Sequence, residues 1–518
     1  MDTGKNDIDP ITLQVLSSAL GSICAEMGAA LIRSSYSTNI KERRDCSTAL
    51  FDASGTLVAQ AEHIPVHLGA LPDAVAAVLA EGPEPGDVFI LNDPFRGGTH
   101  LPDITLVAPV TVDGAIIAYA ASRAHHADVG GSEPGSMPAG SLTLEEEGVV
   151  IGPTRLVAAG EMQQEFLDGF LTRVRRPGER LGDLRAQLGA GRVAQARLEE
   201  LAWREGSRRL AAAMAATVSY SERRMRAEIA DLPDGRYQAE DYLERDGDDL
   251  VIRVAVEIAG DEIAMDFSGT APQEQGNLNC PMAVTRSACY FVMRAITDPD
   301  IPPNAGAVAP VSVSAPAGCL VNAVPPAAVA GGNVEASQRI ADAVALALSK
   351  AVTLPAQSQA TMNNLTLGSD EFNYYETIGG GGGACQERDG ASGIHTGTTN
   401  TLNTPVEALE MAFPLKVERY ELRHGSGGAG QRRGGDGVVR SLRLLAPARL
   451  SLMADRRRHG PRGAAGGEAG LTGRNLVNGR EVPGKVTLSL DAGDTVTVET
   501  PGGGGFGSAS QPPKPAKA

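Results

Sequence analysis

The stretch from residue 92 to 131, NDPFRGGTHLPDITLVAPVTVDGAIIAYAASRAHHADVGG, constrains the fold more than any other part of the chain. Two apolar runs, 104–110 and 115–121, flank Asp113-Gly114, and Asp-Gly between apolar runs is the strongest short-range signal for a β-hairpin. If these two residues form the turn, facing positions have numbers that sum to 227, so Asp103 lies opposite Ala124. The hairpin therefore places His and Asp side chains together at its open end.

These side chains are of the type that binds metal ions. His100 precedes Asp103 by one short turn, and the pair His125–His126 follows the second strand. Imidazole and carboxylate donors without a thiolate suit zinc with an open coordination position, or manganese, and an open position is what activation of a water requires. The alternative is that these residues are ordinary polar groups at the ends of strands. Spacing alone leaves both interpretations open.

Composition excludes several other classes of protein. The chain has 518 residues and a net charge of −17, which argues against nucleic-acid binding because that needs a basic face. Its six Cys include no C-x-x-C pair, which suits a reducing cytoplasm better than a disulfide framework. The N-terminus lacks the features of a signal peptide, and no run of eighteen apolar residues predicts a membrane span. No G-K-[S/T] phosphate loop is present, so we expect any ATP to bind elsewhere.

The pattern of apolar residues predicts one continuous α+β unit with mixed sheets, β-hairpins and packed helices. Asp9-Pro10 is typical of a helix start, and apolar residues from Leu16 to Leu31 recur at helical spacing. Further expected elements are a hairpin at 48–51 and 57–60, a helix at 72–80, a strand at 87–92, two or three helices over 181–229, a three-stranded meander over 236–267, helices at 281–296 and 333–352, and short strands beyond 434. The domain is expected over 8–505, with subdomains of about 8–230, 231–360 and 361–505, and a disordered tail at 508–518.

Several long motifs, in order, resemble one known family. They are DPITLQVLSSAL, KERRDCSTALFDASG, NDPFRGGTHLPDI, RAHHADVGG, MDFSGTAPQEQGNLN, DPDIPPNAG, GGNVEASQR and ADRRRHGPRG, between about residues 8 and 505. Together they resemble the hydantoinase B / 5-oxoprolinase B-subunit family, across nearly the whole chain.

The resemblance implies a function that needs two subunits. Members of the family act in ATP-dependent hydrolysis of cyclic amides such as 5-oxoproline, hydantoins and other lactams. ATP is bound by a hydantoinase A-type ATPase partner, which phosphorylates the substrate, and we expect a heterotetramer of two heterodimers. Related acetone and acetophenone carboxylases make a role in a carboxylase one alternative. A scaffold for the ATPase, with a purely structural metal, is another.

The resemblance also implies which residues form the site. The metal ligands carry over onto Asp45, His100, Asp103 and His125, with zinc or manganese as the expected ion. We assign His126 and Asp128 to proton transfer or to support of the ligands; orienting a loop is the alternative.

Three other features have more than one interpretation. His63 and His67 either approach the site or lie in a surface loop. Residues 455–458 either bind phosphate or carboxylate, contact a partner protein, or form a loop anchored by Asp455. The glycines at 379–383 indicate either close approach of a substrate or a run of turns.

Overall fold

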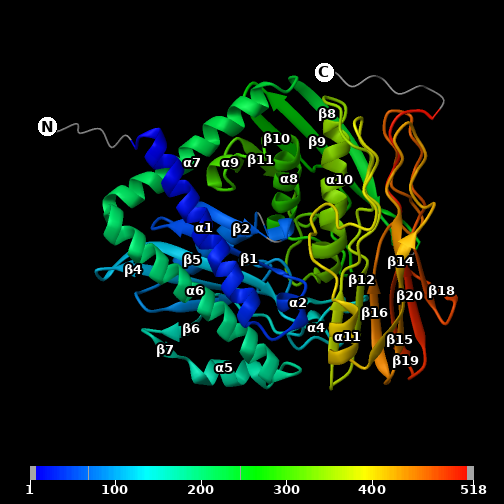
Figure 1. Cartoon of the computed structure of the whole chain (residues 1–518), viewed down its shortest axis with the longest axis horizontal. Coiled ribbons are helices and arrows are strands. Elements are labelled where there is room, and N and C mark those ends of the chain that lie inside the picture. The colour runs from blue at the N-terminus through cyan, green and yellow to red at the C-terminus, as the bar shows by residue number, and fades with distance from the viewer. Residues whose placement is uncertain (1–7, 63, 68, 246, 510–518) are drawn as a thin grey trace.

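The computed structural model describes residues 8–509 except 63, 68 and 246. Its first part is a sheet with strand order β2-β1-β5-β4-β3-β6-β7, in which all neighbours are antiparallel. The strands are β1 (Cys46–Asp52), β2 (Leu57–Glu62), β3 (Val88–Leu91), β4 (Asp103–Val112), β5 (Ala115–His125), β6 (Thr154–Ala158) and β7 (Glu161–Met162). Figure 1 shows this sheet in blue and cyan, on the left side of the molecule.

The predicted hairpin is β4 and β5, but its register differs from the prediction by one residue. Val112 pairs with Ala115, so Asp113 and Gly114 form the two-residue turn, and both have positive φ as a type I′ turn requires. A β-bulge then leaves Ile117 without a partner on β4, because Thr111 pairs with Ile116 and Val110 with Ala118. The predicted pairing of Asp103 with Ala124 is therefore wrong: Asp103 faces His125 itself.

Long helices cover one face of this sheet. They are α1 (Pro10–Ser34), α6 (Pro177–Glu205) and α7 (Ser207–Ala230), and their apolar side chains form one core with β1, β2, β4 and β5. The Asp9 carboxylate accepts hydrogen bonds from the first backbone N–H groups of α1, as predicted. Gly206 separates α6 from α7, whereas Gly189 and Gly191 lie inside α6 and do not interrupt it, because they cost some stability without blocking the helical backbone.

By length and composition alone, helix α1 is long and apolar enough to cross a membrane, with a mean hydropathy of 1.6. The buried helices of globular cores can have the same length and composition, and α1 has a buried stripe that includes Leu16, Leu20 and Leu31. Shorter helices surround the sheet: α2 (Thr38–Lys41), the single turn η1 (Pro65–His67), α3 (Leu71–Leu79), α4 (Leu144–Glu147) and α5 (Gln164–Leu171). Of these, α3 packs on the face opposite α1 and α6, with its own apolar core.

The second part contains the predicted meander. Strands β8 (Gly235–Leu243), β9 (Leu250–Ala259) and β10 (Glu262–Asp266) are joined by β11 (Val311–Ser314), which runs parallel to β10. Helices α8 (Met282–Ile296), α9 (Ala305–Val308) and α10 (Ser337–Leu348) accompany this sheet. The helix expected at 333–352 begins instead with a π-helical turn, η2 (Gly332–Ala336), before α10.

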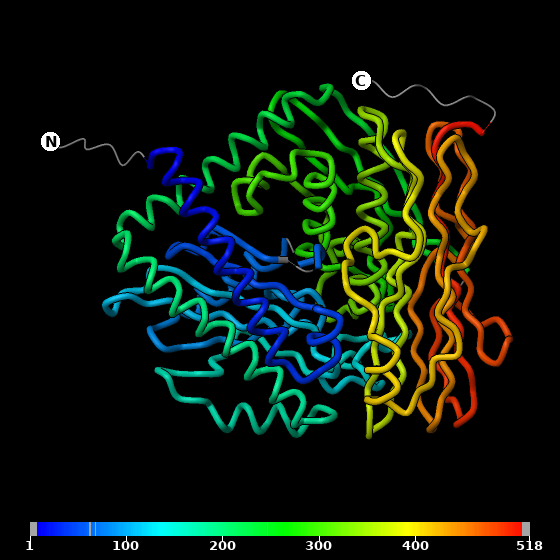
Figure 2. Tube along the Cα trace, viewed as in Figure 1, coloured from blue at the N-terminus to red at the C-terminus, as the bar shows by residue number. Residues whose placement is uncertain are grey.

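The third part is two sheets that share one core. Their orders are β13-β12-β16-β19 and β14-β15-β20-β17-β18. The elements are β12 (Asn364–Gly368), β13 (Asn373–Glu376), α11 (Val406–Ala412), β14 (Leu415–Arg423), β15 (Gly437–Leu444), β16 (Ala448–Met453), β17 (Arg474–Val477), β18 (Arg480–Val482), β19 (Lys485–Leu490) and β20 (Thr495–Glu499). In Figure 2 these segments form the yellow to red layer on the right.

Glycine-rich segments pack backbone against backbone at one end of this third part. A Cβ atom on Gly381 would lie 2.1 Å from the Gly435 carbonyl oxygen, and one on Gly503 would lie 2.0 Å from that of Gly382. The glycines are thus needed for close approach between backbone segments, an explanation that neither of the two interpretations from the sequence included. The whole has the predicted α+β class. The part of the expected tail from residue 510 onward lies outside the described residues.

Candidate metal centre and its cavity

Five side chains meet at the open end of the β4–β5 hairpin. Asp103 begins β4, His125 ends β5, and His100 lies in the loop just before β4. Asp45 precedes β1, and the His125 N–H donates to the Asp45 carbonyl at 3.0 Å, which continues the pairing of β1 with β5. His67 is contributed by η1. The four predicted ligands are therefore brought together, and His67 joins them.

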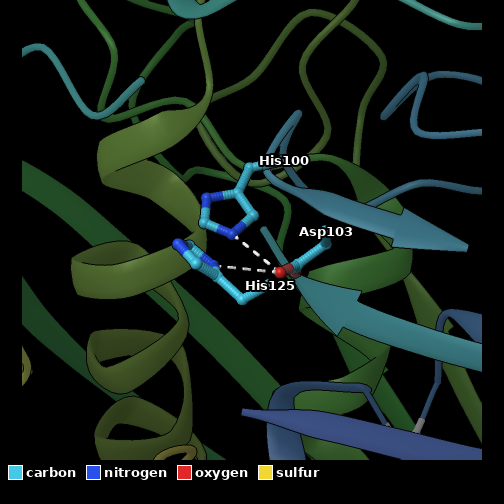
Figure 3. Close-up of side chains that lie close together, drawn as sticks. All are labelled: His100, Asp103 and His125. Atoms are coloured by element: carbon cyan, nitrogen blue, oxygen red, sulfur yellow. Dashed lines mark hydrogen bonds and ion pairs between the residues drawn. The ribbon is translucent and has the colours of Figure 1, made fainter. Parts of the chain in front are cut away.

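The Asp103 carboxylate lies at the centre of the group. His100 Nε2 is 3.1 Å and His125 Nδ1 is 3.2 Å from its Oδ1. Figure 3 draws both contacts as dashed lines. His67 Nε2 is 3.4 Å from its Oδ2, to which the Thr99 hydroxyl also donates at 2.5 Å. All of these side chains are buried. The carboxylate therefore provides a polar partner for several buried groups that have no access to water.

Two overlapping sets of three ligand atoms lie close enough to hold one ion. His100, Asp103 and His125 form one set, and Asp45, His67 and Asp103 form the other, with the atoms of each set within 4.8 Å of one another. Two atoms that each bind one ion at about 2.1 Å, with angles of 90–109°, lie roughly 3.0–3.4 Å apart. The contacts around Asp103 fall in this range, so the donor set fits a divalent ion.

The protonation states also suit metal ligation. Burial opposes ionisation of Asp103, but the imidazoles of His100, His125 and His67 outweigh it and hold the pKa of this carboxyl well below its usual range. Burial lowers the pKa of His125, which favours the neutral ring that binds metals. His100 Nδ1 and His125 Nε2 are buried and have no hydrogen-bond partner among the described residues. These orphaned atoms indicate that the cluster, as it stands, is not fully satisfied.

The position of His67 decides between the two interpretations of the His63 and His67 pair for one of its members. Its Nδ1 is 2.9 Å from the Ser47 hydroxyl, so both of its ring nitrogens face polar groups and the ring orientation is fixed. It approaches the site and is not a surface residue. His63, the other member of the predicted pair, lies outside the described residues.

His126 and Asp128 point away from the cluster. The His126 Nε2 contacts Gln187 of α6 at 2.9 Å, and burial lowers the pKa of this ring to about 4. The Asp128 carboxylate accepts from the backbone N–H groups of Gly130, Gly135 and Arg175. Neither residue lines the cavity beside the cluster. These contacts match the alternative of a loop-orienting role, and the proton-transfer role stays a prediction.

A small cavity of about 20 Å³ adjoins the cluster. The cluster forms one wall, and η2, the end of β13 and the loop 394–402 form the others, through Asn333, Tyr375, Thr377, Thr399 and Thr401. The ring of Tyr375 stacks on His125 with centroids 4.7 Å apart. None of these five residues was predicted for the site, because they are not typical metal ligands and lie more than 200 positions from His100 in the sequence.

The loop at 455–458 has a structural explanation. Asp455 is buried, and its carboxylate accepts from Arg339 at 2.9 Å and from Lys485 at 3.0 Å. Arg456 is also buried and donates to Asp241 at 3.1 Å. Of the three interpretations, these contacts support a loop anchored by Asp455, and both of these charges are already paired.

The fold and the site define a class: a large α+β protein with a buried His and Asp cluster at the open end of a hairpin. Residues 9–509 match the sequence profile described as hydantoinase B/oxoprolinase. The chain belongs to the hydantoinase B/oxoprolinase family.

Two curated relatives illustrate the range of the family. The chain is 39% identical to 5-oxoprolinase 1 of Arabidopsis thaliana over 97% of its own length, but this covers only 42% of the plant protein. It is 31% identical to the B subunit of a putative D-/L-hydantoinase from a Pseudomonas species, over 98% of this chain and 91% of that protein. The chain thus spans about two-fifths of the plant protein and nearly all of the bacterial one.

Solved structures share the fold. The ATP-dependent caprolactamase of Pseudomonas jessenii superimposes with a TM-score of 0.89 at 30% identity, over 97% of this chain and 91% of that one. An acetone carboxylase superimposes with a TM-score of 0.82 at 19% identity, over 96% of this chain and 76% of that one, which is a likeness of fold alone.

Proposed function

We propose that this chain is the ring-opening subunit of an ATP-dependent cyclic amide hydrolase and works with a hydantoinase A-type ATPase subunit. The buried cluster around Asp103 carries this proposal, because its donor set fits a divalent ion within a fold that the caprolactamase shares. The substrate class is that of lactams and hydantoins, and the assembly is two copies of each subunit.

Asp45, His100, Asp103 and His125 would hold zinc or manganese, with His67 beside them. When bound, such an ion lowers the pKa of a nearby water and polarises a carbon–oxygen bond. Asp103 sets the orientation of three imidazoles through its two oxygens. The Ser47 hydroxyl fixes the His67 ring from the far side.

The chemistry divides between the two subunits. A lactam carbonyl is a poor electrophile, so the ATPase transfers a phosphoryl group from ATP to the carbonyl oxygen. On this chain, a water oxygen then bonds to the former carbonyl carbon, the carbon–nitrogen bond breaks, and the ring nitrogen takes a proton. A second water hydrolyses the resulting acyl phosphate to the ring-opened acid and phosphate, whereas ADP is released in the first step, when ATP gives up its phosphoryl group. The cavity of about 20 Å³ has room for a water and not for a ring.

The test is to co-express the chain with a hydantoinase A-type protein of the same genome and to screen 5-oxoproline, hydantoin, 2-pyrrolidone and ε-caprolactam. We expect the ring-opened product, an amino acid or, from hydantoin, an N-carbamoyl amino acid, only when both subunits and ATP are present. The chain alone should neither open a ring nor bind ATP in calorimetry. Micromolar ATP affinity of the isolated chain, or ring opening without the partner, would contradict the proposed division of labour. Incorporation of labelled bicarbonate into acetone would instead identify the complex as a carboxylase.

A further inference from the structure

The cavity beside the cluster has the size of one water molecule. Its volume is about 20 Å³, and a cavity needs roughly 10–15 Å³ to hold a water, which must also find two to four polar partners. Its polar lining is therefore informative about what that water contacts.

Besides His100 and His125 of the cluster, two lining residues carry buried polar atoms that no described residue satisfies. They are the Asn333 Oδ1, from η2, and the Thr399 Oγ1, from the loop 394–402. Both residues are 3% exposed. A buried polar atom without a partner costs about 1–3 kcal/mol, so two of them at one small cavity point to a bound group. The neighbouring Thr401 differs, because its hydroxyl contacts Thr377 at 2.5 Å.

The backbone around Asn333 is held on several sides. A Cβ atom on Gly332 would lie 1.8 Å from the Asn279 carbonyl oxygen, so η2 packs directly on that segment. The Ser337 hydroxyl donates to the Asn333 carbonyl at 2.7 Å, and the Met362 N–H donates to Glu335 at 3.1 Å. A single π-helical turn inside a helix is frequent at functional sites. Asn333 therefore stands at a fixed position in the cavity wall.

The loop that carries Thr399 is held from both flanks. The Val66 N–H donates to the Thr398 carbonyl at 3.2 Å, and the hydroxyls of Thr398 and Ser337 are 3.0 Å apart. Farther along, the Leu402 N–H donates to the Arg43 carbonyl at 3.1 Å. These contacts tie the loop to η1, which carries His67, and to α10, which follows η2 directly. Asn333 and Thr399 thus face one small space from two anchored segments.

We infer that Asn333 and Thr399 are positioning residues that hold and orient the water which adds to the carbonyl carbon of the substrate. The Asn333 Oδ1 accepts one hydrogen of this water, and the Thr399 hydroxyl provides the second contact. A lone pair of the water then stays directed toward the incoming carbon. This inference rests on the proposed function, and it names which residues of the chain position the nucleophile.

The test compares Asn333→Ala, Asn333→Asp, Thr399→Val and Thr399→Ser in the complete complex of both subunits. Loss of one hydrogen bond should lower kcat about tenfold in Asn333→Ala and Thr399→Val, with KM nearly unchanged. ATP cleaved per ring opened should rise, because the phosphorylation step does not use these residues. Asn333→Asp and Thr399→Ser keep an oxygen in place and should recover most of the lost rate. If both residues act on one water, the double variant should lose less than the product of the two single losses.

Asn400→Ala, an exposed asparagine beside Thr399, is the matched control and should behave as wild type. A crystal structure of wild type should show an ordered water within hydrogen-bond distance of Asn333 Oδ1 and Thr399 Oγ1, and Thr399→Val should lose it. Unchanged kcat and coupling in Asn333→Ala and Thr399→Val would overturn the inference, as would loss of bound metal in these variants. If wild type itself opens no ring with ATP and partner, the proposed function fails first. That result can be told apart from a failure of the inference on Asn333 and Thr399, because it is seen in wild type without any variant.

Discussion

Replacing Asp103 by Asn tests the metal centre most directly, because it removes one charge and preserves the shape of a side chain that is 1% exposed. The carboxylate contacts three imidazoles at 3.1–3.4 Å, so its loss should weaken metal binding by at least the 10- to 100-fold that changes around metal ligands typically cause. At a metal concentration of 100 times the wild-type Kd, binding stabilises the wild type by about 2.7 kcal/mol. A 100-fold weaker variant gains only about 0.4 kcal/mol under the same conditions.

The assay measures the rise in Tm on adding zinc or manganese to metal-free protein. An unfolding entropy of about 2.1 cal/mol/K per residue makes 1 kcal/mol worth about 1 °C for a chain of this length. We therefore expect a rise of about 2–3 °C in wild type and below about 0.5 °C in Asp103→Asn. Asp128→Asn is the matched control, since Asp128 is equally buried but outside the cavity; it should lower the Tm of the metal-free protein and keep the full rise. Equal rises in wild type and Asp103→Asn, or no stoichiometric metal in active protein, would refute the assignment.

Two further predictions concern residues around the site. Burial raises the pKa of Glu147 to about 7, so the protonated carboxyl stabilises the fold fully below about pH 4.5, and this contribution is lost as the pH rises through 7. Glu147→Gln should lack this fall, and thermal unfolding of both proteins at pH 5 and pH 8 measures it; parallel pH profiles would contradict the shift. His126→Ala should change kcat less than threefold while lowering Tm, because the ring contacts Gln187 outside the cavity; a hundredfold loss of kcat with normal metal content would restore the proton-transfer role.

Local signals in the sequence were sufficient for the elements that carry the ligands. Asp113-Gly114 fixed the turn of the hairpin, and Asp9-Pro10 fixed the start of α1, because each depends on backbone geometry within a few residues. The β-bulge at Ile117 left no such signal. It depends on how the strands twist against their neighbours, and it moves every later pair by one position. The error in the predicted register mattered little for the site, because the bulge places His125 directly opposite Asp103.

The polar walls of the cavity could not be predicted in the same way. Asn333 and Thr399 lie more than 60 positions apart in the sequence, and both lie far along the chain from His100. Neither residue type is a characteristic metal ligand, and no periodicity connects them with the hairpin. Their role depends on long-range packing that leaves one oxygen of each without a partner among the residues described. The types and spacing of residues along the chain do not indicate which side chains remain unsatisfied after folding.

The cavity lies where all three parts of the molecule meet, and this has an energetic consequence. The hairpin supplies Asp103, the second part supplies Asn333, and the third supplies Tyr375, which stacks on His125. Glu147 ties the first part to the chain just before η2, since its carboxyl oxygens accept from the backbone N–H groups of Val329 and Ala330. Each wall of the cavity has buried polar atoms without a hydrogen-bond partner among the described residues. The contacts between the three parts are therefore less stable while the cavity is empty than when a ligand fills it. Ligands that fill it therefore stabilise the contacts between the parts, and the geometry of the site and the integrity of the fold depend on each other.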